Sequence, residues 1–109
     1  MAGTFTGKVM GEGQLANTKG TIYTVPGATV AFVKRITLFN TNAAQQTVNL
    51  YLKPGATSRQ WRKYVLEQYE SAEVLEAGDS VILEAGDLIE ADTTTASAVD
   101  YVISGVEET

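Results

Sequence analysis

The sequence predicts an all-β fold, an antiparallel β-sandwich or jelly roll of about eight strands. Three observations support this fold class. Val, Ile, Thr and Tyr dominate the apolar stretches, and these residue types favour strands. Gly, Pro, Asn and Asp interrupt the stretches about every 8–12 residues, as turns between short strands do. The 109 residues suffice for one domain, and 44% hydrophobic against 19% charged residues is typical of a globular chain.

The first nineteen residues differ from the rest of the chain, because they contain four glycines and few large apolar side chains. Two interpretations stay open. Residues 1–19 are either a flexible arm that becomes ordered against a partner, or a segment that carries one edge strand. We assign residues 20–109 to the β-sandwich domain in both cases.

Residues 28–40 (ATVAFVKRITLFN) form the longest expected strand. One face of this strand is expected to carry Val30, Phe32, Ile36 and Leu38. Lys34 interrupts that face. We expect a bulge or bend near Lys34 and Arg35, because it would let the strand change partners.

The strands around it follow from turns and alternation. Residues 20–25 (GTIYTV) end at Pro26 and Gly27, which form a turn pair. In residues 47–54, the expected inner face carries Val48, Leu50 and Leu52, and the outer face carries Asn49 and Tyr51. In residues 97–108, one face carries Val99, Tyr101 and Ile103, and the other carries Asp100, Val102 and Ser104.

Residues 58–74 (SRQWRKYVLEQYESAEV) fit two structures. In a helix, Trp61 and Val65 would share a stripe with Tyr64 and Tyr69. In a strand, Trp61, Lys63 and Val65 would share one face. We favour the extended structure, because the neighbouring segments are all expected strands.

A short repeat follows, in which Leu75–Asp79 (LEAGD) returns as Leu83–Asp87. The acids within each copy do not match the alternating ligands of an EF-hand loop. The glycine suits the third position of a type II turn, where φ is positive. We therefore expect strand, turn, short strand, turn and strand, with the acids on solvent-facing turns. A metal site, a carboxylate pair and an acidic contact surface are the alternatives.

The composition argues against several classes of function. The chain contains no cysteine and no histidine, so it lacks the commonest general base and the usual transition-metal ligands. We expect no enzyme activity, no cofactor and no metal. A net charge of −5 and an isoelectric point near 4.6 argue against nucleic-acid binding. We also expect no signal peptide and no membrane span, because long apolar runs are missing.

The candidate binding residues are aromatic and cationic, because Trp, Tyr and Arg are the usual anchors of protein interfaces. The candidate protein interface consists of Phe5, Arg59, Trp61, Arg62, Tyr64 and Tyr69. Two alternatives stay open. The aromatic side chains could stack on sugar rings, or Trp61 and two of the tyrosines could fill one end of the core.

Several segments carry a resemblance to a known group of proteins. They are Tyr23–Gly27 (YTVPG), Thr29–Asn42, Val48–Leu52 (VNLYL), Leu83–Asp87 (LEAGD) and Ile103–Glu107 (ISGVE). In this order they resemble a widespread group of small virion proteins of tailed bacteriophages. The similarity covers about residues 20–108, and its motifs are strand and turn patterns.

The resemblance implies a β-sandwich or jelly-roll virion protein and supplies no functional residues. The expected function is that of a head decoration, or cement, protein. Such a protein binds the major capsid protein and copies of itself as a homo-oligomer. It would be made in the host cytoplasm and would lie on the outer surface of the capsid. The alternative is a tail, baseplate or fibre module that binds a host glycan through Trp61.

Overall fold

The computed structural model describes residues 3–75 and 78–109. Within them the chain forms strands and no helix, so no described helix could cross a membrane. The strands are β1 (Phe5–Gln14), β2 (Gly20–Thr24), β3 (Val30–Asn40), β4 (Gln46–Lys53), β5 (Arg59–Leu66), β6 (Ser71–Glu73), β7 (Val81–Leu83), β8 (Leu88–Thr93) and β9 (Val99–Glu108).

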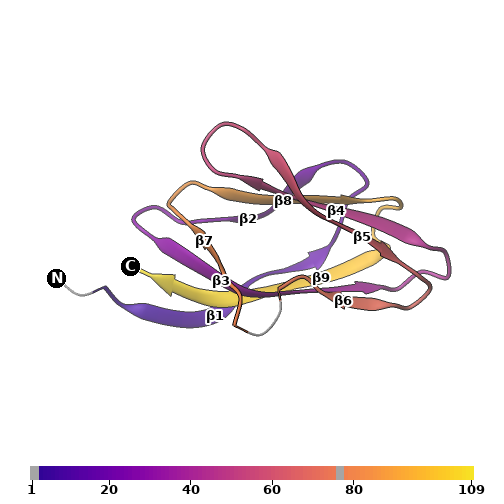
Figure 1. Cartoon of the computed structure of the whole chain (residues 1–109), viewed down its shortest axis with the longest axis horizontal. Coiled ribbons are helices and arrows are strands. Elements are labelled where there is room, and N and C mark those ends of the chain that lie inside the picture. The colour runs from indigo at the N-terminus through magenta and orange to yellow at the C-terminus, as the bar shows by residue number, and fades with distance from the viewer. Residues whose placement is uncertain (1–2, 76–77) are drawn as a thin grey trace.

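The strands form two antiparallel sheets that lie one above the other (Figure 1). Sheet A has the order β1-β9-β3-β6, and β7 also pairs with β3. Sheet B has the order β2-β8-β4-β5. Since β6 and β7 pair with successive parts of β3, they share one strand position. This order is that of an eight-position jelly roll, so the predicted fold class is confirmed.

The hydrophobic core lies between the two sheets. In β4, Val48 and Leu50 are fully buried, while Asn49 and Tyr51 lie on the outer face. In β9, Val99 and Ile103 are fully buried, and Val102 is exposed on the other face. The predicted alternation is confirmed in both strands. Each fully buried Val, Leu or Ile stabilises the fold by about 1.5–3 kcal/mol.

A bulge divides β3 at the expected position. Val33 pairs with Gly105, and Arg35 pairs with the adjacent Ser104, so Lys34 is the extra residue. Before the bulge β3 pairs with β7, and after it β3 pairs with β6. The prediction that β3 changes partners near Lys34 is confirmed.

The prediction that Val30 and Phe32 share one face of β3 with Ile36 and Leu38 is wrong. Ala31 and Val33 are buried before the bulge, whereas Val30 and Phe32 are partly exposed. One extra residue reverses the alternation of a strand, so the inward positions change from odd to even numbers at Lys34. Beyond the bulge Ile36 and Leu38 are buried, as predicted.

Residues 58–74 are extended, as favoured, but the predicted face of β5 is wrong. Gln60 and Arg62 oppose the adjacent residues Tyr51 and Leu50 of β4, so Trp61 is an extra residue in a second bulge. The predicted face contained Trp61, Lys63 and Val65. The observed inward side chains are instead those of Trp61, Tyr64 and Leu66. Lys63 and Val65 are exposed, because the bulge changes the alternation.

The second copy of the repeat forms the expected turn. The Asp87 N–H donates to the Glu84 carbonyl at 3.0 Å, and Gly86 has a φ of 87°. This geometry is that of a type II turn with glycine at its third position. The Asp87 carboxylate accepts a hydrogen bond from the Glu84 N–H at 2.9 Å. In the first copy Gly78 has a φ of 91°, and residues 76 and 77 lie outside the described residues.

Of the two interpretations of residues 1–19, the structure contains the edge strand. Residues 5–14 form β1, which pairs with β9 and lies at the edge of sheet A. Thr4 and Thr109 exchange backbone hydrogen bonds of 2.8 and 2.9 Å beyond the ends of the two strands. Leu15 follows β1 and is buried in the core.

Candidate interaction surfaces

Four of the six candidate interface residues lie on β5, the edge strand of sheet B. Arg59 and Arg62 are exposed, and Trp61 and Tyr64 are half-buried. Tyr69 lies in the turn after β5, where it is exposed and has a φ of 56°. The sixth residue is Phe5, which is on β1 of the opposite sheet. The structure therefore divides the predicted interface between two sheets.

The aromatic residues of β5 are anchored in the protein. Trp61 and Tyr64 pack against the hydrophobic core, and the Tyr64 hydroxyl donates to the Val74 carbonyl at 3.4 Å. The Arg62 guanidinium lies over the Trp61 ring, 4.8 Å from its centroid, which is a cation–π geometry. The two aromatic side chains thus support the strand, and Trp61 also contacts Arg62.

Cations gather around β5. Five of the chain's eight Lys and Arg residues lie on β4, on β5 or beside them. We call this set the basic edge: Lys19, Lys53, Arg59, Arg62 and Lys63. Lys19 donates to the Ser58 hydroxyl at 3.3 Å and lies 4.7 Å from the Tyr51 ring centroid, which places it beside these strands. In a chain of net charge −5, this concentration suits an acidic partner surface.

The outer face of sheet A is unusually apolar. Seven large hydrophobic side chains are exposed among the described residues, and strand pairing places five of them on this face. These are Phe5, Val9, Phe39, Ile82 and Val102. Of these five, only Phe5 was among the candidate interface residues predicted from the sequence. The available signal was β3, whose apolar residues occupy both faces, whereas a solvent-facing sheet alternates apolar and polar residues.

A hollow of about 220 Å³ lies at one end of this face. It is lined by Phe5, Phe32, Lys34 and Val106. The centroids of the two phenylalanine rings are 6.4 Å apart. Gly7 pairs with Val106 and contributes no side chain, so the sheet surface stays open beside them. The hollow is therefore an apolar depression with one cation at its rim.

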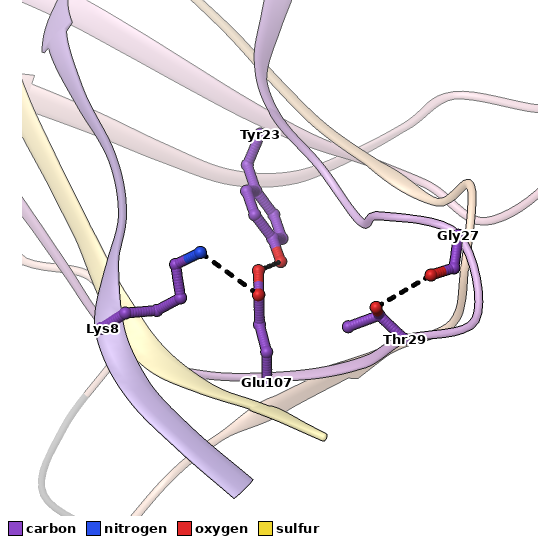
Figure 2. A network of polar contacts seen from close by, with 5 residues as sticks. All are labelled: Lys8, Tyr23, Gly27, Thr29 and Glu107. Atoms are coloured by element: carbon purple, nitrogen blue, oxygen red, sulfur yellow. Dashed lines mark hydrogen bonds and ion pairs between the residues drawn. The ribbon is translucent and has the colours of Figure 1, made fainter. Parts of the chain in front are cut away.

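A second depression, a groove of about 390 Å³, lies between β1 and β2 where the two sheets meet. Glu107 is only 8% exposed. Its carboxylate accepts a hydrogen bond from the Tyr23 hydroxyl at 2.6 Å. Lys8 forms an ion pair with it at 3.3 Å (Figure 2). Beside them the Thr29 hydroxyl donates to the Gly27 carbonyl at 3.0 Å.

This network connects the two sheets. Burial, followed by the hydrogen bond to Glu107 and its negative charge, raises the pKa of Tyr23 above the ordinary value of 10.0. The Tyr23 hydroxyl of β2 therefore stays protonated and donates to the Glu107 carboxylate of β9. Lys8 of β1 donates to the same carboxylate. The contacts compensate the burial of Glu107. The sequence did not predict this network. Glu107 is buried and Glu108 is partly exposed, but nothing in the sequence distinguishes these two adjacent glutamates.

The acidic side chains were the alternative candidates for a metal site. Among residues 3–75 and 78–109, no three His, Cys, Asp or Glu side chains form a set that could hold a metal ion.

Comparison with solved structures identifies a similar fold. A protein of Bacillus endospore appendages, described as a novel family of disulfide-linked pili, is 17% identical over 98% of this chain and 89% of its own, with a TM-score of 0.53. A chain of the infectious bursal disease virus Gt strain is 7% identical over 97% of this chain and 32% of its own. Its TM-score of 0.31 is too low to support an argument.

No protein-family model matches the chain, and no curated protein does. At 17% identity the appendage protein shows the fold alone. That fold is a β-sandwich that an assembling structural protein also uses.

Proposed function

We propose that the chain is a non-enzymatic structural protein of a bacteriophage virion, a head decoration protein that docks on the assembled major capsid protein. The basic edge is the observation that carries this proposal. Arg59, Arg62 and Lys63 are exposed on one edge strand that contains no acidic residue. An acidic patch on a large assembly would attract this edge and orient the protein on arrival.

The edge is ordered before any partner binds. Trp61 and Tyr64 pack against the core, and Arg62 lies over the Trp61 ring. Side chains that are already held lose little conformational entropy on binding. Trp, Tyr and Arg are also the residues that contribute most to protein interfaces. The edge is thus suited to a stable contact with another protein.

The segments that resemble phage virion proteins agree with the fold. VNLYL belongs to β4, LEAGD forms the turn before β8, and ISGVE belongs to β9. The comparison with the appendage protein adds a precedent for this fold in a protein that assembles. This chain contains no cysteine, so copies of it would assemble without the disulfides that the appendage protein's description mentions.

The glycan-binding alternative has less support. A sugar ring would have to stack on an exposed face of Trp61. Arg62 already lies over that ring, and Trp61 is half-buried against the core. These contacts favour the proposal of a capsid decoration protein over that of a glycan-binding tail module.

The basic edge is tested by reversing the charge of Arg62. We expect Arg62→Glu to weaken binding to assembled capsids at least about tenfold, because it replaces an attraction by a repulsion. Binding is measured by co-sedimentation at low occupancy, where bound copies are isolated. Lys34→Glu, the same charge change on sheet A, is the control and should leave the affinity within about twofold. Equal losses in both variants would show a general charge effect and remove the support of the basic edge.

The location on the particle is tested separately. Quantitative mass spectrometry of purified particles should find hundreds of copies, on the order of the number of capsid subunits, and cryo-electron microscopy should place them on the head. A few copies at the tail would favour the glycan-binding alternative. Absence from the particle would contradict both functions.

A further inference from the structure

We propose that the apolar end of the outer face of sheet A binds a second copy of this chain across a two-fold axis. The inference deepens the proposed function and rests on it, because copies of a decoration protein are held close together on a shell. It names the surface through which neighbouring copies contact each other.

Strand register arranges the outer face of sheet A in rows across the strands. Row 1, at the end of the sheet, contains Phe5, Glu108 and Val30. Row 2 contains Gly7, Val106, Phe32 and Ile82. Row 3 contains Val9, Ser104 and Arg35. Rows 1 and 2 therefore carry one charged side chain among their seven residues, and the hollow beside Gly7 lies within them.

The three rows are self-complementary. If a second copy packs face to face about an axis that follows row 2, each strand lies over its own counterpart and row 1 lies over row 3. Phe5 of one copy then faces Val9 of the other, which is a contact between two exposed apolar side chains. Glu108 lies over Ser104 and beside Arg35 of the other copy, so opposite charges meet. Row 2 packs against itself, as an isologous interface requires.

Arg35 is available for this contact. Within its own chain it forms a long ion pair of 3.7 Å with Glu73, and both side chains are largely exposed. An exposed ion pair of this kind stabilises little. Arg35 can therefore leave Glu73 and pair with Glu108 of a second copy at little cost in free energy.

Three of the edge strands are less suited to self-association than this face. β1 has a bulge at Met10, β2 has one at Ile22 and β5 has one at Trp61. β5 also carries the exposed cations. Bulges and charges are the devices by which edge strands avoid pairing with other chains. Rows 1 and 2 carry Glu108 and have Lys34 at the rim of the hollow, but their apolar side chains Phe5 and Ile82 are more than half exposed.

The size of the surface predicts a weak contact. Four strands about 4.8 Å apart and three rows about 7 Å apart give roughly 300–400 Å² of flat area for each copy. A stable interface buries about 800 Å² on each partner. We therefore expect monomers at about 10 μM and dimers only near about 1 mM. On a shell the high local concentration would make such a contact effective.

Self-association is measured by analytical ultracentrifugation of the full chain from about 10 μM to about 1 mM. We expect Ile82→Asp to weaken dimerisation at least about tenfold, because the two-fold axis along row 2 would bring the new charge of each copy opposite that of the other copy. Val65→Asp is the matched control, since Val65 is 50% exposed on sheet B and Ile82 is 62% exposed on sheet A. A wild-type protein that stays monomeric at the highest concentration would overturn the inference, as would equal losses in both variants.

A charge exchange tests the arrangement of the two copies. Glu108→Lys and Arg35→Glu should each weaken dimerisation, and the double variant should restore at least half of the lost affinity on a logarithmic scale. If the apolar rows associate in many orientations, the double variant should not recover affinity. Additive losses in the double variant would overturn the two-fold arrangement.

Binding to capsids separates this inference from the proposed function. Wild-type protein should fill the shell cooperatively, whereas Ile82→Asp should dock with unchanged affinity at low occupancy and without cooperativity. If Ile82→Asp abolishes docking of isolated copies, the apolar end contacts the capsid protein and the inference is wrong, while the decoration function stands. If the wild type binds no capsid, the proposed function fails, and ultracentrifugation still decides whether two copies pair through this face.

Discussion

Gly105 of β9 lies directly against the backbone of β3. A Cβ atom at this position would overlap the Phe32 carbonyl oxygen and would lie 3.0 Å from the Lys34 nitrogen. Both neighbours are backbone atoms in the bulge of β3, so neither can move without disturbing the sheet. The absence of a side chain at residue 105 is therefore a condition for the bulge.

We expect Gly105→Ala to destabilise the protein by about 1–3 kcal/mol, the usual cost of forcing extra atoms into a packed site. Urea unfolding followed by circular dichroism measures the change. Gly27→Ala is the control, because a Cβ there meets no atom within 4 Å, and its effect should stay within about 0.5 kcal/mol. Similar losses in the two variants would show that Gly105 tolerates a side chain.

The Tyr23 hydroxyl satisfies a carboxylate that is almost fully buried. Removal of one partner leaves a buried polar atom with fewer hydrogen bonds, which costs about 1–3 kcal/mol. The pKa of Tyr23 is raised in the folded protein, first by burial and then by Glu107. The unfolded chain therefore loses this proton first as the pH rises, near the ordinary value of about 10. The stabilisation is complete below that pH and is lost above it.

Tyr23→Phe should reduce the free energy of unfolding by about 1–3 kcal/mol at pH 7, and the difference from the wild type should shrink as the pH rises above about 10. Urea unfolding at a series of pH values tests both statements. Tyr69→Phe, which changes an exposed tyrosine, should have little effect at any pH. A wild-type advantage that persists undiminished above pH 10 would contradict the assigned role of the hydroxyl.

At the scale of elements, the bulge at Lys34 sets which residues of β3 enter the core. Ala31 and Val33 are buried before it, and Ile36 and Leu38 after it. A strand without the extra residue could not bury both pairs, because its side chains alternate strictly. The bulge thus allows β3 to place apolar side chains in the core along its whole length.

Deletion of Lys34 should abolish cooperative folding or lower the free energy of unfolding by more than about 3 kcal/mol, because one half of β3 would turn its apolar residues away from the core. Circular dichroism and thermal unfolding measure the loss. Deletion of Ala43, an exposed residue between β3 and β4, is the control and should be tolerated. A folded protein of near-normal stability without Lys34 would show that β3 can shift its register.

The same element explains how far the sequence could predict the strands. Where a strand is regular, as in β4, alternation of apolar and polar residues identified the inner face. In β3 and β5 the alternation changes at Lys34 and at Trp61, so the residues that were expected to share one face do not share it. A bulge is a property of two paired strands. The sequence of one strand shows where alternation fails, but not which residue is extra.

At the scale of the whole molecule, the fold class followed from turn spacing and composition, whereas the surfaces did not. Phe5 and Trp61 were grouped because both are aromatic, yet they lie on different sheets. Row 2 joins residues of β1, β9, β3 and β7, so only the strand order reveals it. Strand order depends on pairing between segments that are distant in the sequence. A local sequence pattern does not predict such pairing.

The two proposed surfaces lie on opposite sheets of the sandwich. The basic edge belongs to sheet B, and the apolar rows belong to the outer face of sheet A. One copy can therefore contact a shell through one sheet and a neighbouring copy through the other. Such an arrangement stabilises only the assembled state, because both partners are present together only there.

The pairing of β1 with β9 also determines when the protein can fold during synthesis. β1 is made before the other described strands, but its hydrogen-bonding partner β9 is made after all of them. β9 separates β1 from β3, so sheet A cannot close before β9 has left the exit tunnel. Until then β3 lacks its partner β9, and its apolar residues are not yet covered by a complete sheet. The nascent chain therefore depends on rapid completion, or on a chaperone, to avoid association with other unfinished chains.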